Sequence, residues 1–442
     1  MNSDLDQLYP AHLAEVRSRT AAALEACGYD GVVIYSGQPS LQFLDDRPYP
    51  FRVNPHFKHW LPLTDAPDCF IAWVPGEEPL LCFHQPADYW HLPPALPTAP
   101  WTTQWNIEVL RDAAAARRFL PLDGRRIALI GEPQQYFADW GFAAINPPGL
   151  LNRLHYSRGV KTPYEIECMR RASATGARAH VAARDAFLGG ASEFEVHLAY
   201  CEAAGLREEE LPYGNIIAFN EAAAVLHYQH LDRRRGGPRR SFLIDAGTEF
   251  RGYACDITRT YSAADDEFGA LIAGMEALQR ELCGAVRSGT DYRDLHLRAH
   301  RLIGELLHQV GVIDCSAESA VETGTTGVFF PHGIGHLLGL QVHDVAGLAA
   351  GPKGGEIPRP AGHPYLRLTR RLEPGFVVTI EPGIYFIDLL LDAARDGAAG
   401  RSIRWDAVER LRPFGGIRIE DDVHCTTDEP ENLTRDAFAA LG

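Results

Sequence analysis

The sequence lacks the cysteine patterns of disulfide-rich and zinc-ribbon proteins. Its nine cysteines are scattered over 442 residues, and no C-x-x-C pair occurs. Small secreted scaffolds depend on paired cysteines, and structural zinc sites use closely spaced ones. We therefore expect free thiols in the reducing cytoplasm.

Positive charge and long apolar runs are also scarce. Lys and Arg number 42 against 58 Asp and Glu, which gives a net charge of −16. Nucleic acids and anionic membranes attract basic surfaces, so this balance argues against both as partners. The N-terminus, MNSDLDQLYP, has no apolar signal-peptide core, and no uncharged apolar run approaches a membrane span in length. These absences favour a soluble, cytoplasmic protein.

The length and the 46% content of hydrophobic residues predict two or three packed domains. Helical spacing over 11–27 ends at Gly28, and a buried strand is expected at 31–37. Together with the later strand signals, this alternation predicts an N-terminal α/β domain. The later strands are expected at 69–74, 79–83 and 126–131.

A helix-start signal marks the boundary of this domain. Thr162 is a cap candidate, Pro163 suits the first helical position, and Glu165 completes a capping box. We expect a helix from there to about residue 188, then strands at 215–219, 241–247 and 376–383 and a surface loop at 346–364. The predicted domains are 1–155 and 165–442, joined by a linker at 156–164.

Two aspartates lie where the sequence predicts a hairpin. Asp245 ends the run SFLID before a glycine turn, and Asp256 lies in a second strand-like run, CDITRTYS. A carboxylate within a strand is costly to bury unless it is paired or binds a cation. The two residues fit a metal site, although aspartates at a turn or a sheet edge would give the same pattern.

Three histidines follow in FFPHGIGHLLGLQVHD, at His332, His336 and His343. The spacing of the first two resembles a zincin helix, but the glutamate is missing and glycines interrupt the helix. A glycine-rich turn that brings imidazoles to a cavity fits better, and ordinary core or surface histidines remain the alternative.

Two glutamates complete the pattern at the ends of apolar strands. Glu381 follows FVVTI, and Glu420 follows GGIRI. Either one alone is compatible with a strand-terminal charge that points to water. Four carboxylates with one imidazole suit two Mn, Co, Fe or Zn ions, which together activate a bridging hydroxide.

The ordered motifs DAG, DITRT, HGIGH, TIEPG and GGIRIED resemble those of the pita-bread metallopeptidases, which include methionine aminopeptidase, aminopeptidase P and prolidase. Over nearly the whole chain the sequence is similar to bacterial Xaa-Pro dipeptidases, a subgroup that also contains organophosphorus acid anhydrolases. The resemblance implies an α/β N-terminal domain and an α+β pita-bread catalytic domain with a curved, mainly antiparallel sheet.

The resemblance also implies roles for individual residues. Asp245 would bind one metal ion, Asp256 and Glu420 would bridge two ions, and His336 and Glu381 would hold the second. Manganese is the metal expected from the family, with Co, Zn or Fe as the other candidates. The remaining implied residues orient substrate, support the site or line its pocket: Tyr213, His227, His332, His343, Tyr385 and Arg418.

Arg367, in YLRLTR, resembles the arginine with which prolidases bind the free carboxylate of a C-terminal proline. A bidentate contact of that kind restricts an enzyme to dipeptides. A surface arginine is the alternative. Asp45 and Asp46 resemble a loop that reaches a partner subunit's active site, which implies a homodimer, whereas a solvent-exposed turn is the alternative.

The resemblance implies hydrolysis of Xaa-Pro dipeptides, with organophosphorus ester hydrolysis as a side activity. Aminopeptidase P-like cleavage of longer Xaa-Pro peptides is the main alternative and would leave Arg367 unexplained. A non-catalytic binding protein on the same fold is a third possibility, although such relatives are expected to have lost metal ligands.

Overall fold

The computed structural model describes residues 3–442, which divide into two compact units. The first comprises the chain up to Arg158 together with Thr162–Cys168 and Ala350–Gly355. The second comprises Gly159–Lys161, Met169–Ala349 and Glu356–Gly442. These units are defined by compactness alone, and the domain limits expected from the sequence stay a prediction.

The first unit is built on a six-stranded mixed sheet with the order β4-β3-β2-β1-β5-β6. Its central strand β1 runs antiparallel to β2 and parallel to β5. All five residues of β1, GVVIY, are buried, as expected for a strand covered on both faces. The strands are β1 (Gly31–Tyr35), β2 (Phe70–Trp73), β3 (Leu80–His84), β4 (Asn106–Leu110), β5 (Ile127–Ile130) and β6 (Ala144–Ile145).

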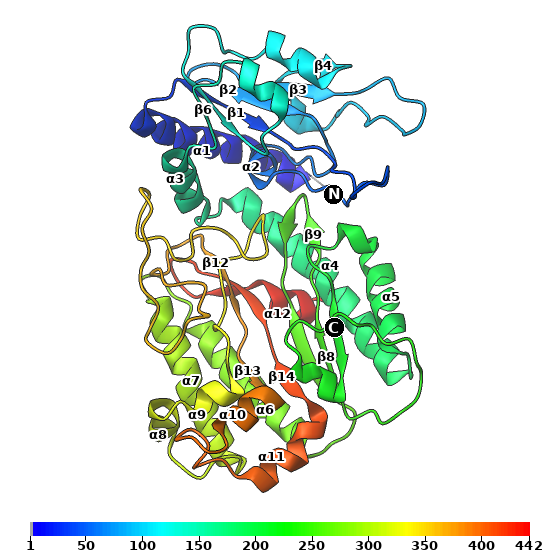
Figure 1. The fold of residues 1–442 in the computed structure, drawn as a ribbon, viewed down its shortest axis with the longest axis vertical. Coiled ribbons are helices and arrows are strands. Elements are labelled where there is room, and N and C mark those ends of the chain that lie inside the picture. Colours follow the sequence, from blue (N-terminus) through cyan, green and yellow to red (C-terminus); the bar gives the residue numbers. More distant parts are fainter. Residues whose placement is uncertain (1–2) are drawn as a thin grey trace. The chain divides into compact units, whose positions relative to one another are not determined.

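Helices cover this sheet, and Figure 1 shows α1 running along it. Helix α1 begins at Ser3, earlier than the predicted start at residue 11, and it contains Pro10. A proline inside a helix normally ends it, so sequence rules place the start too late. The helical segments are α1 (Ser3–Cys27), α2 (Pro55–Trp60), α3 (Pro148–Arg158), and the 3-10 turns η1 (Pro100–Gln104), η2 (Ala113–Arg118) and η3 (Gln135–Asp139).

The predicted capping box at the start of helix α4 (Pro163–Leu188) is confirmed. The backbone N–H of Thr162 donates to Glu165 Oε2 at 2.8 Å, and the N–H of Glu165 points back to Thr162 Oγ1 at 3.5 Å. The helix ends at the predicted residue because Gly189 and Gly190 follow it.

All strand pairs of the second unit are antiparallel among the residues that the structure describes. They form the sheets β11-β8-β7 and β12-β15-β16 and the pairs β13-β14 and β10-β9. The strands are β7 (Ile216–Phe219), β8 (Ser241–Asp245), β9 (Glu249–Phe250), β10 (Tyr253–Ala254), β11 (Thr258–Ser262), β12 (Val377–Ile380), β13 (Gly383–Tyr385), β14 (Gly416–Arg418), β15 (Asp421–His424) and β16 (Glu431–Asn432).

A large hydrophobic core packs helices α6 (Glu267–Gly284) and α7 (Tyr292–Gln309) of the second unit against β12. It includes Leu271 and Met275 from α6, Ile303 from α7, and Val378 and Ile380 from β12. In Figure 1, α4 and α5 lie on one side of β8, and α7 to α10 gather toward β13. The remaining segments are α5 (Glu193–Ala204), α6 (Glu267–Gly284), α7 (Tyr292–Gln309), α8 (Ala317–Glu322), α9 (Thr325–Phe329), α10 (Asp388–Ala394), α11 (Trp405–Leu411), α12 (Leu433–Ala439), η4 (Glu208–Glu210), η5 (Asn220–Ala224) and η6 (Arg412–Phe414).

The described segment between α9 and β12, residues 330–376, contains no helix or named strand. The loop predicted at 346–364 lies within it and is confirmed. The prediction that the histidine motif is not helical is also confirmed, because His332, His336 and His343 all lie in this segment.

All nine cysteines carry free thiols, as the scattered spacing predicts. Within residues 3–442, the helices are too short or too polar to cross a membrane.

Candidate active site

The two predicted aspartates come together around one tyrosine hydroxyl. Asp245 is the last residue of β8, and Asp256 lies two residues before Thr258, which pairs with Asp245 across β8 and β11. The hydroxyl of Tyr213 lies 2.8 Å from Asp245 Oδ1 and also within hydrogen-bond distance of Asp256 Oδ1. A hydroxyl donates only one proton, so it holds the two carboxylates close without fully satisfying both.

His336 reaches the same point from the segment between α9 and β12. Its backbone N–H donates to Thr379 Oγ1 at 3.1 Å, and the N–H of Thr379 donates to the His336 carbonyl at 3.0 Å. This close approach requires glycine at 335, where φ is +152° and an added Cβ would lie 2.1 Å from the Thr379 carbonyl oxygen. The HGIGH glycines therefore position the imidazole.

The His336 ring presents Nε2 to the carboxylates. Nδ1 lies 3.0 Å from the Leu337 carbonyl, which accepts its proton, and Nε2 lies 3.5 Å from Asp256 Oδ2 and 3.7 Å from Glu381 Oε1. Burial lowers the pKa of this imidazole, but Asp256 and Glu381 outweigh burial and the net pKa is raised. A cation is therefore favoured between these groups.

Glu381 and Glu420 complete the cluster. Glu381 directly follows β12, and its N–H donates to the Ile334 carbonyl at 2.9 Å. Glu420 lies between β14 and β15 and forms a bridge with Thr258, whose hydroxyl donates to Glu420 Oε2 at 2.7 Å. We call the set of Asp245, Asp256, His336, Glu381 and Glu420 the acidic centre.

Burial disfavours the negatively charged form of several carboxyl groups in the acidic centre. It raises the pKa of Glu381 to about 7 and that of Glu420 well above its usual range. Burial also raises the pKa of Asp245, although the Arg418 guanidinium opposes it. Buried carboxylates that repel one another in this way are stabilised by protons or by bound cations.

The donors present fit divalent metal ions. One ligand atom each from Asp256, His336 and Glu420 lies within 4.8 Å of the others. Asp245 and Glu381 contact this group through Tyr213 and through His336, respectively. Carboxylate oxygens with one imidazole suit hard or borderline divalent ions, which agrees with the sequence prediction.

Arg418, Tyr385 and His332 form a hydrogen-bonded chain at the edge of the acidic centre. Arg418 donates to Asp245 Oδ2 at 2.6 Å and to the Tyr385 hydroxyl at 2.9 Å. The Tyr385 hydroxyl lies 2.9 Å from His332 Nε2, and His332 Nδ1 lies 2.8 Å from the Gly333 carbonyl. Because that carbonyl requires a proton on Nδ1, Nε2 accepts from the tyrosine. Burial lowers the pKa of His332 to about 3, so its ring is neutral.

The structure also brings His343 to this site. Its ring centroid lies 4.4 Å from that of His336, at an interplanar angle of 86°. Burial, followed by the charges of His336 and Arg367, lowers the pKa of His343 to about 4. His227 contributes to the same shift, so Arg367 and His227 both lie within electrostatic range of His343.

Asp45 belongs to the first unit and lies in an exposed turn. Its Oδ1 accepts the N–H of Arg47 at 3.2 Å, and the preceding Leu44 has a φ of +56°. Phe43 and Leu44 expose 88% and 90% of their surface. The role of Asp45 in a partner subunit's active site stays a prediction.

Sequence reasoning missed Thr258 and understated Tyr213. Thr258 holds Glu420 through its hydroxyl and also accepts from Arg418 Nε at 3.2 Å. Tyr213 was expected only to line the pocket, yet it contacts both aspartates. Neither role is visible in spacing, because each depends on strands that are distant in the sequence.

Comparison with known proteins agrees with this geometry. Residues 7–156 match the family model "Xaa-Pro dipeptidase, N-terminal domain", and residues 167–427 match "Metallopeptidase family M24". The Xaa-Pro dipeptidase of Stenotrophomonas maltophilia strain K279a is 53% identical over 441 residues, covering 100% of this chain and 99% of the relative. That of Xanthomonas campestris pv. campestris strain B100 is 51% identical over 437 residues, covering 99% of each.

Solved structures share the fold at low sequence identity. Aminopeptidase P from E. coli with the inhibitor Pro-Leu has a TM-score of 0.72 and 22% identity, over 96% of this chain and 95% of that one. Proline aminopeptidase P II from Yersinia pestis has a TM-score of 0.70 and 23% identity, over 97% of this chain and 100% of that one. The expected α/β N-terminal domain and pita-bread catalytic domain are thereby confirmed. The chain belongs to metallopeptidase family M24 and carries the N-terminal domain of its Xaa-Pro dipeptidases.

Proposed function

We propose that this protein is a metal-dependent dipeptidase that releases proline from Xaa-Pro dipeptides. The observation that carries the proposal is the acidic centre, in which five donors from distant parts of the chain approach one another. Relatives named Xaa-Pro dipeptidase support the substrate class, since they match over the full chain. The aminopeptidase P structures share only the fold with this chain. They therefore give weaker support to the alternative, which is cleavage of longer Xaa-Pro peptides.

Two divalent ions would occupy the acidic centre, with manganese as the preferred metal. Asp245 would hold one ion, His336 and Glu381 the other, and Asp256 and Glu420 both. When bound, divalent ions of this kind lower the pKa of coordinated water and polarise carbonyl oxygens.

Glu381 is the proposed proton carrier. With a pKa raised by burial to about 7, its carboxyl group can accept a proton from the attacking water near neutral pH. The proline nitrogen of the scissile amide carries no hydrogen, so it must gain a proton as the carbon–nitrogen bond breaks. Glu381 returns the proton there, which yields the free amino acid and proline.

The neighbouring side chains orient substrate and hold the ligands. His343 would donate to the oxygen of the tetrahedral intermediate, next to His336. The chain from Arg418 through Tyr385 fixes the neutral His332 ring, which would orient the substrate. His227 would contact the proline ring.

Arg367 is the proposed determinant of substrate length. It is exposed, and its charge helps to lower the pKa of His343. A bidentate bond to the free carboxylate of proline would favour dipeptides, because a longer peptide has an amide at that position.

A homodimer and a cytoplasmic location complete the proposal. We expect a homodimer in which Asp45 meets the substrate ammonium of the partner's site. The nine free thiols fit a cytoplasmic location.

The test compares initial rates on Ala-Pro, Ala-Pro-Ala and Ala-Ala, using chelated enzyme before and after Mn²⁺ addition. Cleavage of Ala-Pro alone, restored by Mn²⁺, is the expected result. Faster cleavage of Ala-Pro-Ala would assign the aminopeptidase P activity instead. No cleavage of any peptide by the metal-loaded protein would overturn the proposal.

A further inference from the structure

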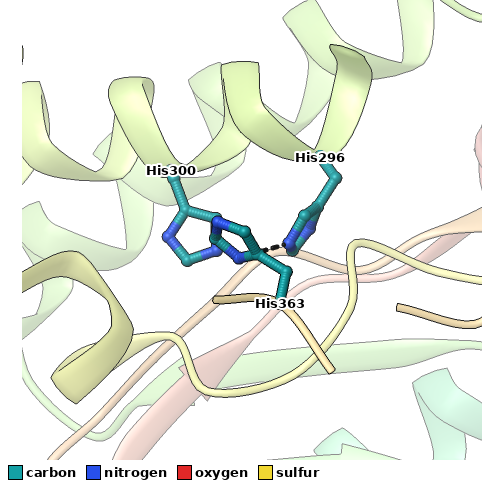
Figure 2. Close-up of side chains that lie close together, drawn as sticks. All are labelled: His296, His300 and His363. Atoms are coloured by element: carbon teal, nitrogen blue, oxygen red, sulfur yellow. Dashed lines mark hydrogen bonds between the residues drawn. The ribbon is translucent and has the colours of Figure 1, made fainter. Parts of the chain in front are cut away.

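A second group of metal-ligating side chains lies in the second unit, outside the acidic centre. His296 and His300 lie one turn apart on α7, and His363 comes from the segment between α9 and β12 (Figure 2). One ring nitrogen of each lies within 4.8 Å of the other two. We call these three residues the histidine triad.

The three rings turn toward one another, as Figure 2 shows. His296 Nε2 lies 2.9 Å from His363 Nδ1, and the ring centroids of the three pairs are 4.6, 4.6 and 4.8 Å apart. The spacing of His296 and His300 is i, i+4, which places two side chains on one helix face. A helix and a loop therefore bring three imidazoles to one point.

The triad keeps unused nitrogen atoms in a buried position. His296 is 1% exposed and His300 is 2% exposed. Among the described residues, His296 Nδ1 and His300 Nε2 have no hydrogen-bond partner. A buried polar atom without a partner costs free energy, so a cation that accepts the lone pair of His300 Nε2 would be stabilising.

The protonation state suits a metal ligand. Burial, followed by the charges of neighbouring histidines, lowers the pKa of His296 to about 2 and that of His300 to about 3. Burial also lowers the pKa of His363. The rings are thus neutral near pH 7, and neutral imidazole is the form that binds metal.

His300 also has the outer contact typical of a metal-binding histidine. Its Nδ1 lies 2.9 Å from the hydroxyl of Thr326, which fixes the ring and leaves Nε2 for another partner. Hydrogen bonds of this kind orient metal-ligating imidazoles in many proteins. Access is available too, because His363 is half-buried and its neighbours at 361, 362, 364 and 365 are exposed.

We infer that the histidine triad binds one zinc-class divalent cation and thereby ties the loop around His363 to helix α7. Zinc binds imidazole nitrogen at about 2.0–2.1 Å, which separates tetrahedral nitrogen ligands by about 3.3 Å. The His296–His363 separation of 2.9 Å would open slightly on binding, and the third nitrogen would move inward. Solvent water would complete the coordination, as at open three-histidine sites.

The test counts metal on the full-length protein. Wild-type, His363→Ala and His308→Ala proteins are stripped, loaded with Zn²⁺, desalted and measured by mass spectrometry for bound zinc. His308 is the matched control, because it is an exposed histidine near the end of the same helix. We expect His363→Ala to bind one equivalent fewer than wild type and His308→Ala to bind the same number.

A spectroscopic measurement separates this site from the acidic centre. Each protein is loaded with Co²⁺ in the His336→Ala background, which removes a ligand of the acidic centre. Intense visible absorption typical of four-coordinate cobalt is expected, and it should be lost when His363→Ala or His300→Gln is added. His300→Gln serves as a second test with a polar side chain in the buried position, and thermal melting checks that each variant is folded.

Equal zinc content in wild type and His363→Ala, or a cobalt spectrum unchanged by His363→Ala and His300→Gln, would overturn the inference. The triad would then be a hydrogen-bonded histidine cluster only. This outcome is independent of peptide hydrolysis, so it is distinguishable from failure of the proposed function.

Discussion

The acidic centre and the histidine triad respond to burial in opposite ways. In the acidic centre, burial raises the pKa of Glu381 and Glu420 and thus favours protons on carboxyl groups. In the triad, burial lowers the pKa of His296 and His300 and keeps the imidazoles neutral. The first site requires added positive charge, whereas the second offers lone pairs without charge. Burial alone therefore does not define a metal site, because the donor chemistry decides what each site binds.

The largest expected effect separates the two sites by function. His336→Ala removes an imidazole from the acidic centre, and we expect the rate of Ala-Pro hydrolysis to fall more than about 100-fold. Loss of a residue that hydrogen-bonds to a metal ligand already lowers metal affinity or activity by about 10- to 100-fold. Loss of the ligand itself should lower activity more. The measurement is kcat/KM with saturating Mn²⁺, and His308→Ala is the control. Near-normal activity in His336→Ala would place the chemistry elsewhere.

Arg367 tests whether substrate length is set beside the acidic centre. Arg367→Ala should lower kcat/KM for Ala-Pro by roughly 10- to 150-fold, because a hydrogen bond to a charged group contributes about 1.5–3 kcal/mol. Rates on Ala-Pro-Ala should change much less. The exposed Arg371 provides the control, since it donates to the Gly289 carbonyl. An equal loss in Arg371→Ala, or an equal loss on both substrates, would contradict a carboxylate-binding role.

As the pH falls, the acidic centre should lose its metal before the histidine triad does. A carboxyl group whose pKa is raised to about 7 takes up a proton as pH falls through 7, and that proton competes with the metal. The triad imidazoles have lowered pKa values and remain neutral at pH 6. Metal affinity of the acidic centre should thus fall about fivefold from pH 7 to pH 6, because one proton competes with the metal for a group that is half protonated at pH 7. Titration with a competing chelator at both pH values measures this, and parallel losses at the two sites would refute the difference.

The smallest expected effect concerns the outer contact of the triad. Thr326→Val removes the hydroxyl beside His300 Nδ1, and zinc affinity of the triad should fall about tenfold, at the lower end for such partners. Affinity of the acidic centre should stay the same. Thr323→Val is the matched control, because that hydroxyl donates to the Ser319 carbonyl instead. Identical zinc affinity in Thr326→Val and wild type would show that this hydroxyl does not support a metal ligand.

The acidic centre was largely predictable because each donor has a local signal. Asp245 and Glu381 end apolar strands, and the glycines beside His336 indicate a turn. The start of α4 was also predictable, since its capping box is contained in four consecutive residues. These features depend on neighbours in the sequence, so spacing is sufficient to find them.

The histidine triad was not predicted, because only part of it has a local signal. The i, i+4 spacing of His296 and His300 was available, but it equally fits the buried face of an amphipathic helix. His363 lies in the loop predicted at 346–364, and no sequence rule indicates which helix such a loop approaches. Likewise, the contact of Thr258 with Glu420 joins residues 162 positions apart. Long-range contacts of this kind require the folded chain.

The irregular segment between α9 and β12 carries functional residues of several kinds in one continuous stretch of the chain. It contributes His336 to the acidic centre, His363 to the triad and Arg367 to the proposed substrate contact, while the carboxylates lie in strands or within two residues of one. Exchange of residues 330–376 between two family members would thus transfer one metal ligand, the proposed length selectivity and the third histidine in a single step. The carboxylates at the strand ends would stay in place in the receiving protein.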